Sequence, residues 1–221
     1  MLTFGLSFST NKNMKIVPAV SLITIIEVVA ILVGAFSGFI EARRKRMDIV
    51  GVFIVAFITA FGGGTVRDIL LDKRPLFWVA HQEYTILLFV VALLAAPFFK
   101  HIRHIVSERL IVIADAVGLG LFAVASVAQA LAADMPIFVA VMMGVVTGIF
   151  GGVLRDIICN EVPMVFRDGK PYAICAFFGC WFYIALQYTQ VSDDVALWSS
   201  AGLITVMRLL AWRFDLKISR P

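Results

Sequence analysis

The sequence predicts an all-α integral membrane protein with seven transmembrane helices, arranged as two inverted three-helix repeats plus a seventh helix. Of the 221 residues, 61% are hydrophobic and 15% are charged, and the mean hydropathy is +0.96. A soluble domain has nearer a quarter of its residues charged. Apolar runs of about 20 residues, the length of a membrane-spanning helix, recur along the chain. The two halves of the chain also match each other at a constant offset of 88 residues.

Each predicted span is an apolar run bounded by polar or charged residues. The seven runs are Val20–Ile40, Asp48–Leu71, Tyr84–Phe99, Arg109–Ala132, Pro136–Ile158, Tyr172–Tyr188 and Ala196–Trp212. Lys15 followed by an apolar run is similar to the start of a signal peptide. Glu27 interrupts that run, which then continues to Ile40, so we expect a retained span.

The repeat rests on polar and special residues that occupy matching positions without a gap. The matched pairs are Glu27 and Asp115, Thr59 and Thr147, Gly63-Gly64 and Gly151-Gly152, Arg67-Asp68 and Arg155-Asp156, Pro75 and Pro163, and Tyr84 and Tyr172. Each unit holds three spans, an odd number, so the copies must insert with opposite orientation, as in many transport proteins. We therefore expect an outside extension at 1–19, repeats at 20–104 and 105–190, and a seventh helix with a cytoplasmic tail at 191–221.

The distribution of Lys and Arg predicts the orientation of the chain. The loops after the first, third and fifth spans and the tail hold Arg43, Arg44, Lys45, Arg46, Lys100, Arg103, Arg167, Lys170, Arg213, Lys217 and Arg220. The opposite side holds Lys12, Lys15, Lys73 and Arg74. The positive-inside rule places the N-terminus outside and the C-terminus in the cytoplasm of a bacterial or archaeal plasma membrane. Arg208, inside the seventh span, is expected to snorkel to the cytoplasmic face.

Two motifs carry the candidate site, one in the second span and one in the fifth. Both place glycines shortly before an Arg-Asp pair, with two residues between the last glycine and the arginine, and glycine is a poor helix former. We expect both helices to break there and to line a path, since freed carbonyl groups suit a cation. The predicted kink residues are Gly62, Gly63, Gly64, Phe150, Gly151 and Gly152. The alternative is that the glycines only allow close helix packing, the interpretation we favour for Gly34, Gly38, Gly144 and Gly148.

Six charged residues of the two repeats fall inside apolar runs rather than at their ends, and charge inside such a run is expensive and usually functional. They are Glu27, Arg67, Asp68, Asp115, Arg155 and Asp156. Sequence neighbours do not face each other on a helix, so we expect each arginine to pair with Glu27 or Asp115 and to leave its own aspartate free. The charges either line and gate a path or form salt bridges that only hold the fold, and the sequence leaves both possibilities open.

The sequence holds no signal for an enzyme, a metal site or a cofactor. The three glycines lack the Gly-Lys-Ser/Thr that a phosphate loop requires. Cys159, Cys175 and Cys180 have no metal spacing. Cys175 and Cys180 fall in an apolar run and are expected to be fillers facing lipid or the core. His81, His101 and His104 lie in loops and are expected to be interfacial. The basic residues alternate with apolar runs, so the expected partner is membrane lipid rather than nucleic acid.

The two glycine motifs, together with Asp115-Ala116-Val117-Gly118-Leu119-Gly120-Leu121-Phe122, resemble the prokaryotic branch of the trimeric intracellular cation (TRIC) channels. The repeated unit of that family is also described as a glycine-transporter domain. The resemblance covers about Val20 to Trp212. It implies a homotrimer with one pore per protomer, lined by kinked second and fifth helices and conducting potassium and also sodium ions. Glu27 stands where the family is expected to have Asp, and Phe150 replaces the first glycine of the second motif.

Two other classes of function remain compatible with these residues. A secondary transporter of a small solute, such as an amino acid, also uses inverted repeats, broken helices and buried charge. A structural membrane subunit without a path is the third class.

Overall fold

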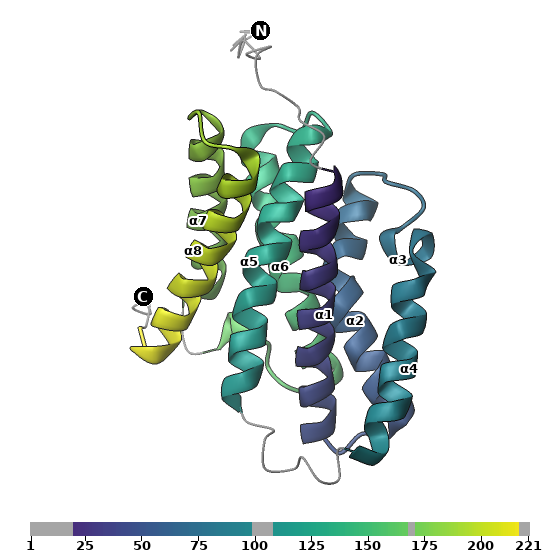
Figure 1. Cartoon of the computed structure of the whole chain (residues 1–221). Helices are drawn as coiled ribbons and strands as arrows, with labels where there is room; N and C mark the ends of the chain where they lie inside the picture. The colour runs from purple at the N-terminus through teal and green to yellow at the C-terminus, as the bar shows by residue number, and fades with distance from the viewer. Residues whose placement is uncertain (1–19, 99–107, 168–170, 217–221) are drawn as a thin grey trace, which may run out of the picture.

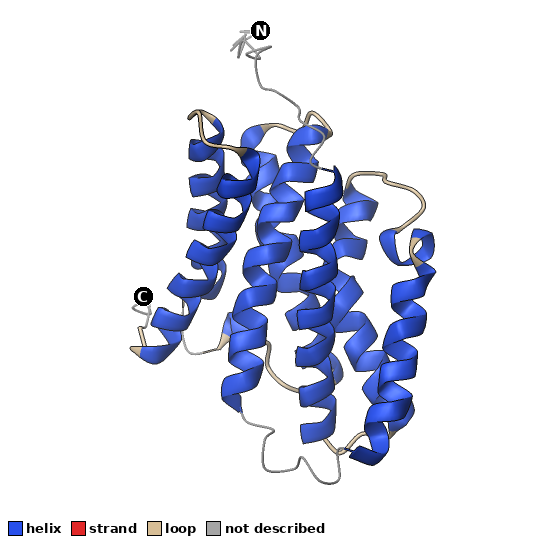
Figure 2. Ribbon diagram, in the orientation of Figure 1, coloured by secondary structure: helices blue, strands red, loops and turns tan. Residues whose placement is uncertain are grey.

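The computed structural model describes residues 20–98, 108–167 and 171–216, and within them the chain is helical, without a strand (Figure 2). The elements are α1 (Val20–Arg44), α2 (Ile49–Leu70), α3 (Phe77–Ala80), α4 (Gln82–Phe98), α5 (Glu108–Ala132), α6 (Ile137–Ile158), the 3-10 helix η1 (Met164–Phe166), α7 (Tyr172–Gln187) and α8 (Asp193–Arg213).

Each of the seven predicted spans coincides with one long helix. The largest difference is at the C-terminal end of α1, which continues past Ile40 to Arg44. Among the described residues, five helices are long and apolar enough to cross a membrane, and α4 and α7 are shorter apolar helices of 17 and 16 residues. The short elements α3 and η1 were not predicted, because each is only a single turn in the loop after α2 or α6.

The helices form one bundle in which corresponding helices of the two halves run in opposite directions (Figure 1). In the view of Figure 1, α1 descends, α2 ascends and α4 descends, whereas α5 ascends, α6 descends and α7 ascends. Helix α1 packs against α2 and α5, and α2 packs against α6. Helix α8 lies against α5 and α7 at the edge of the bundle. The two central helices, α2 and α6, are therefore antiparallel neighbours.

Helices α2 and α6 end in the same way, directly after their Arg-Asp pairs. Asp72 and Asn160 have positive φ angles of 51° and 54°. The next amide in each case donates to the backbone carbonyl of Asp68 or Asp156 at 2.8 Å. This is a Schellman cap, which satisfies carbonyl groups at the end of a helix. Each Arg-Asp pair therefore lies in the last turns of its helix, and the two pairs lie toward opposite ends of the bundle.

The crossing of α2 and α6 depends on one glycine from each helix. A Cβ atom on Gly63 would lie less than 3.0 Å from the carbonyl oxygen of Thr147, and one on Gly151 would lie equally close to the carbonyl of Thr59. Both contacts place a glycine Cα against a carbonyl, a geometry typical of close helix pairs. Because the glycines of each repeat meet the threonines of the other, this crossing joins the two halves of the protein reciprocally.

The predicted breaks at Gly62, Gly63 and Gly64 and at Phe150, Gly151 and Gly152 are wrong at the level of secondary structure, whereas a bend of the helix axes at these residues stays a prediction. Both α2 and α6 are helical without interruption through these residues. Neighbouring helices surround the glycines and stabilise the helical conformation, which outweighs their weak intrinsic helix propensity. For Gly63 and Gly151, the alternative of close helix packing describes the structure.

The other glycine stripes also lie at helix contacts, as predicted. Gly34 and Gly38 of α1 face the backbone of α2, where a Cβ on Gly38 would lie 2.7 Å from the Cα of Ala56. Gly144 and Gly148 of α6 face α5, including Ala123. These small residues bring α1, α2, α5 and α6 close together, the usual basis of helix association in membranes.

We expect Gly63→Ala to destabilise the protein and Gly64→Ala to leave its stability unchanged or slightly higher. The added methyl group at position 63 has no room against the backbone of α6, and overpacking of this kind costs about 1–3 kcal/mol. At position 64 the nearest atom to a Cβ is Arg67 Nη2 at 3.8 Å, and alanine improves helix propensity. Thermal unfolding in detergent, followed by the loss of the native gel-filtration peak, measures both variants. Equal melting temperatures would contradict the role assigned to Gly63.

Candidate functional site

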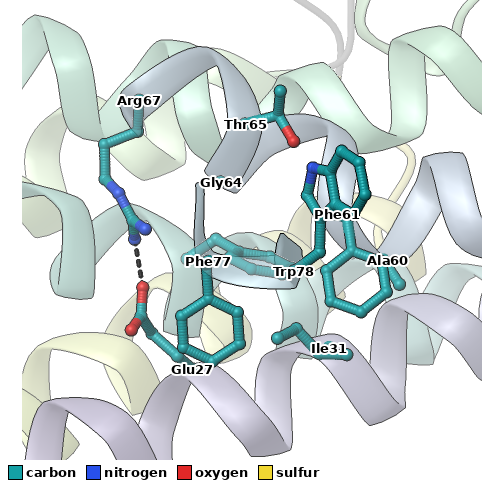
Figure 3. Close-up of a pocket in the computed structure, with 10 residues that line it drawn as sticks. Glu27, Ile31, Ala60, Phe61, Gly64, Thr65, Arg67, Phe77 and Trp78 are labelled. Atoms are coloured by element: carbon teal, nitrogen blue, oxygen red, sulfur yellow. Dashed lines mark hydrogen bonds and ion pairs between the residues drawn. The ribbon is translucent and has the colours of Figure 1, made fainter. Parts of the chain in front are cut away.

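The first site joins α1 to the C-terminal end of α2 through the guanidinium of Arg67. Arg67 Nη1 donates to Glu27 Oε1, and its Nε and Nη2 donate to Asp68 Oδ1 at 2.9 and 2.6 Å. Arg67 is 1% exposed, and both carboxylates are buried. Figure 3 shows the Arg67 and Glu27 side chains pointing toward one another and in contact, beside a cavity that both line. The predicted pair of Arg67 with Glu27 is therefore present.

The prediction that Asp68 is free is wrong. Asp68 Oδ1 accepts two bonds from the neighbouring Arg67, and Oδ2 accepts the backbone amide of Phe77 at 3.0 Å. Sequence neighbours point in different directions from the helix axis, but the arginine side chain is long enough to fold back to the adjacent carboxylate. Asp68 therefore links the end of α2 to the start of α3.

The second site repeats this arrangement between α5 and α6. Arg155 Nη1 donates to Asp115 Oδ1 at 3.1 Å, and Nε donates to Asp156 Oδ1 at 2.9 Å. Asp156 Oδ2 accepts the backbone amide of Met164 at 2.8 Å, which links α6 to η1. Arg155 is 1% exposed. As at the first site, the predicted pairing of Arg155 with Asp115 is present, and the aspartate predicted to be free is occupied.

Three further polar residues take part in the sites and were not predicted from the sequence. Gln129 Nε2 donates to Glu27 Oε1 at 2.9 Å, and Ser37 Oγ accepts from Arg155 Nη1 at 2.5 Å. The hydroxyl of Tyr172 donates to Asp115 Oδ2. Gln129 and Ser37 each reach the site of the other repeat.

The repeat alignment points to these three residues only weakly. Ser37 corresponds to Ala125, so its hydroxyl is not duplicated. Gln129 corresponds to the buried Glu41, which pairs with Arg44. Tyr172 does match Tyr84, but a shared aromatic residue is weak evidence for a hydrogen bond to a carboxylate. The available signal was only that Ser37 and Gln129 are polar residues inside apolar runs.

The two sites differ in the space beside the buried charges. The first site borders a cavity of about 10 Å³, room for about one water molecule, whose walls include Glu27, Arg67, Phe61, Phe77 and Trp78 (Figure 3). The space beside Asp115 and Arg155 is filled by surrounding side chains and leaves no room for water. The carboxylates of both sites are buried, so the difference lies in the small cavity beside Glu27 and Arg67.

A cluster of charges at one end of the bundle joins the two halves outside the apolar region. Glu161 pairs with Lys45 of the turn after α1 at 2.5 Å and with Arg167. The pKa of Glu161 lies below its ordinary value, first because Lys45 donates a hydrogen bond and second because Arg167 does. The lowered pKa means that the ionised carboxylate stabilises the fold above its ordinary pKa, and that this stabilisation is lost as the pH falls.

The remaining predicted residues have simpler environments. Cys159, Cys175 and Cys180 are buried free thiols. His81 contacts the exposed Glu83 at 3.1 Å, whereas His101 and His104 lie outside the described residues.

The prediction that Arg208 snorkels to the membrane surface is wrong. Its side chain is 2% exposed, and the guanidinium carbon lies 4.4 Å from the centre of the Tyr172 ring. Helix α8 packs on α5 and α7 with this face, which directs the side chain into the bundle.

Comparison with known proteins identifies the family. A family model described as "Glycine transporter" matches the chain twice, over residues 24–100 and 112–188, with the same 88-residue offset found in the sequence. The solved structure of a TRIC trimeric intracellular cation channel orthologue from Rhodobacter sphaeroides is 32% identical and covers 89% of this chain and 100% of its own, with a TM-score of 0.80. This chain belongs to the prokaryotic TRIC channel family. A second solved TRIC cation channel is 33% identical, covers 90% of this chain and 96% of its own, and has a TM-score of 0.77.

Curated relatives named as UPF0126 membrane proteins span nearly the same length. The inner membrane protein YadS of Escherichia coli is 34% identical over 194 residues, which is 87% of this chain and 93% of YadS. A membrane protein of Vibrio cholerae is 32% identical over 198 residues, which is 90% of this chain and 82% of the relative. Relatives of this kind are membrane or channel proteins, and the similarity to solved TRIC channels supports a cation channel rather than an enzyme.

We expect Tyr172→Phe to destabilise the protein, and Tyr84→Phe, at the matching position of the first repeat, to have little effect. Removing the Tyr172 hydroxyl deletes a hydrogen bond to a buried carboxylate, which is worth about 1.5–3 kcal/mol. The Tyr84 hydroxyl makes no hydrogen bond within the described part of the chain. The melting temperature of each variant in detergent gives the comparison, and an equal loss in both would contradict a specific role for the Tyr172 hydroxyl.

Proposed function

We propose that this protein is a passive channel for monovalent cations, potassium and also sodium, with one path per protomer that runs along the crossing of α2 and α6. The observation that supports it best is the pair of buried sites at opposite ends of this crossing. Each site holds one arginine against two carboxylates, so each carries one excess negative charge. Six residues, Glu27, Arg67, Asp68, Asp115, Arg155 and Asp156, are the proposed pore or gating charges.

Excess negative charge at low dielectric favours cations over anions. One unit charge about 7 Å from an ion changes its energy by about 2 kcal/mol at an effective dielectric constant of about 20. That difference is enough to select cations without a dedicated binding site. Glu27 is the best placed of the carboxylates at the first site to act on an ion, because it lines the cavity, whereas Asp68 is fully engaged by Arg67 and Phe77.

The assembly we propose is a homotrimer in the plasma membrane, with seven spans per protomer in two inverted repeats. The opposite helix directions of the two halves support the inverted repeats (Figure 1). The solved orthologue from Rhodobacter sphaeroides is described as a trimeric channel, and exposed apolar side chains on α4, such as Leu93 and Leu94, suit lipid or a neighbouring protomer. No cofactor is needed for this function, since the ions themselves are the cargo.

The family description "Glycine transporter" favours a second candidate, a transporter of a small amino acid. The geometry of the first site argues against it. The cavity beside Glu27 and Arg67 has room for about one water molecule, less than glycine requires. Arg67, the natural partner for a substrate carboxylate, already binds two carboxylates of the protein itself.

The decisive test of channel function is electrical. Purified protein in a planar bilayer with a potassium chloride gradient should show unitary current steps, with a reversal potential close to that of potassium. Sodium should also carry current. Glycine uptake into proteoliposomes without unitary currents would instead support the transporter.

We expect Glu27→Gln to assemble normally but to lower the preference for cations over anions about threefold or more. The amide removes the charge beside the cavity and keeps an acceptor for Arg67 and Gln129. Asp68→Asn serves as the comparison, because one amide cannot accept from both Arg67 and the Phe77 amide. It should reduce the yield of assembled protein, because the Phe77 amide or part of the Arg67 guanidinium loses its acceptor, at a cost of about 1–3 kcal/mol. Wild-type selectivity in Glu27→Gln would remove Glu27 from the proposed path.

We also expect the N-terminal side of α1 to face outward and the turn after α1 to face the cytoplasm. Arg43, Arg44, Lys45 and Arg46 lie at that turn, whereas Asp134 lies at the opposite end of the bundle. Asp134→Cys should therefore react with an impermeant maleimide added to intact cells. The native cysteines are buried and provide a low background. Labelling only after the cytoplasmic face is exposed would reverse the assigned orientation.

A further inference from the structure

Helix α8 lies outside the two repeats and brings an additional positive charge to the second site. Arg208 of α8 lies over the ring of Tyr172, with 4.4 Å between the guanidinium carbon and the ring centre. The hydroxyl of the same tyrosine donates to Asp115, which pairs with Arg155. Arg208 is therefore separated from the Asp115 carboxylate only by the tyrosine side chain.

The guanidinium of Arg208 is not satisfied by hydrogen bonds. Its Nε and Nη1 atoms are buried and have no acceptor among the described residues, and the side chain is 2% exposed. A buried charged group without hydrogen-bond partners is destabilising. The contact with the Tyr172 ring offsets part of this cost as a cation–π interaction. Stability alone therefore gives no reason for an arginine at this position, since an apolar side chain would pack there without the penalty.

The charge of Arg208 makes the two sites electrostatically different. The repeats give each site one arginine and two carboxylates, and Arg208 offsets the excess negative charge at the second site. The first site receives no equivalent charge from α8. Lys73 approaches the first site through Gln129, but its ammonium group is exposed, so water and salt screen it.

We propose that the charge of Arg208 raises the electrostatic barrier for cations at the second site. The current at one voltage should then differ in size from the current at the opposite voltage. This inference rests on the proposed cation-channel function. A cation that passes the first site meets uncompensated negative charge, whereas at the second site the charge is balanced by Arg208. A path with unequal electrostatic barriers at its two ends conducts unequally at voltages of opposite sign. Arg208 is thus a permeation-determining residue contributed by α8, which is not part of the repeat.

Single-channel recording of Arg208→Met and Arg208→Lys, with Arg213→Gln as the control, tests this assignment. Arg213 is an exposed arginine in the last turn of the same helix. We expect Arg208→Met to raise potassium conductance about threefold or more and to reduce the ratio of currents at opposite voltages. Arg208→Lys keeps the charge but loses the planar stacking, so its currents should remain close to wild type. Arg213→Gln should leave both quantities unchanged.

Stability measurements separate this role from a structural one. Arg208→Met should keep or raise the melting temperature, because it removes a buried group that lacks hydrogen bonds. If that variant does not assemble, Arg208→Gln provides a second neutral side chain and should show the same change in current.

Three results would overturn the assignment. Wild-type conductance and current ratio in both neutral variants would show that the charge does not control permeation. Equal changes in the lysine and methionine variants would show that ring packing, not charge, is responsible. Absence of current from the wild-type protein would overturn the channel function together with this inference. Current in the wild-type protein, with the same conductance and current ratio in the neutral variants, would overturn this inference alone.

Discussion

The close approach of α2 and α6 is the constraint on which the rest of the structure depends. At Gly63 and Gly151 the backbone of each helix meets a threonine carbonyl of the other, and no side chain larger than hydrogen fits there. In a bilayer, apolar side chains gain little by leaving lipid for one another, so helix association depends on packing of this kind. This one crossing connects the two repeats at their centre and places the Arg-Asp pairs toward opposite ends of the bundle. If α2 and α6 lay farther apart, the helices that carry the two charged sites would no longer pack against each other.

The second constraint is that each charged side chain buried in the apolar bundle needs a partner of opposite charge. Each central arginine binds a carboxylate from its own helix and one from a neighbouring helix, so a single residue ties two helices together. The neighbouring aspartate then accepts a backbone amide from the loop that follows, which anchors α3 or η1. Asp68 and Asp156 thus combine a structural role with a contribution to the local charge. Glu27 and Asp115 come from neighbouring helices, and of the two only Glu27 borders the small cavity.

The two sites differ in their side chains although the repeat that contains them is clear in the sequence. Phe150 replaces a glycine in the second motif. The Tyr172 hydroxyl donates to Asp115, whereas the matching Tyr84 makes no such hydrogen bond to Glu27. Side chains fill the second site, whereas the first borders a small cavity. Helix α8 then adds Arg208 to the second site alone. The inverted repeat places two similar charged sites toward opposite ends of the bundle, and these differences make the two sites distinct in charge and in packing.

Much of the architecture could be predicted from the sequence because it depends on local composition. The lengths of the apolar runs determine the helices, and the offset of 88 residues identifies the repeat. The pairing of Arg67 with Glu27 and of Arg155 with Asp115 follows because a charge in an apolar run needs a partner of opposite sign.

What the sequence left open depends on which face of each helix meets its neighbours. The glycines of α2 and α6 have weak helix propensity, yet both helices are continuous because neighbouring helices enclose them. Arg208 lies near the end of its helix, where an arginine can snorkel, but the packing of α8 on α5 and α7 directs it toward Tyr172. Length, composition and the repeat therefore determined the helices and the charge pairs. Tertiary packing decided the continuity of the central helices and the difference between the two sites. Both of these features depend on contacts between residues far apart in the chain.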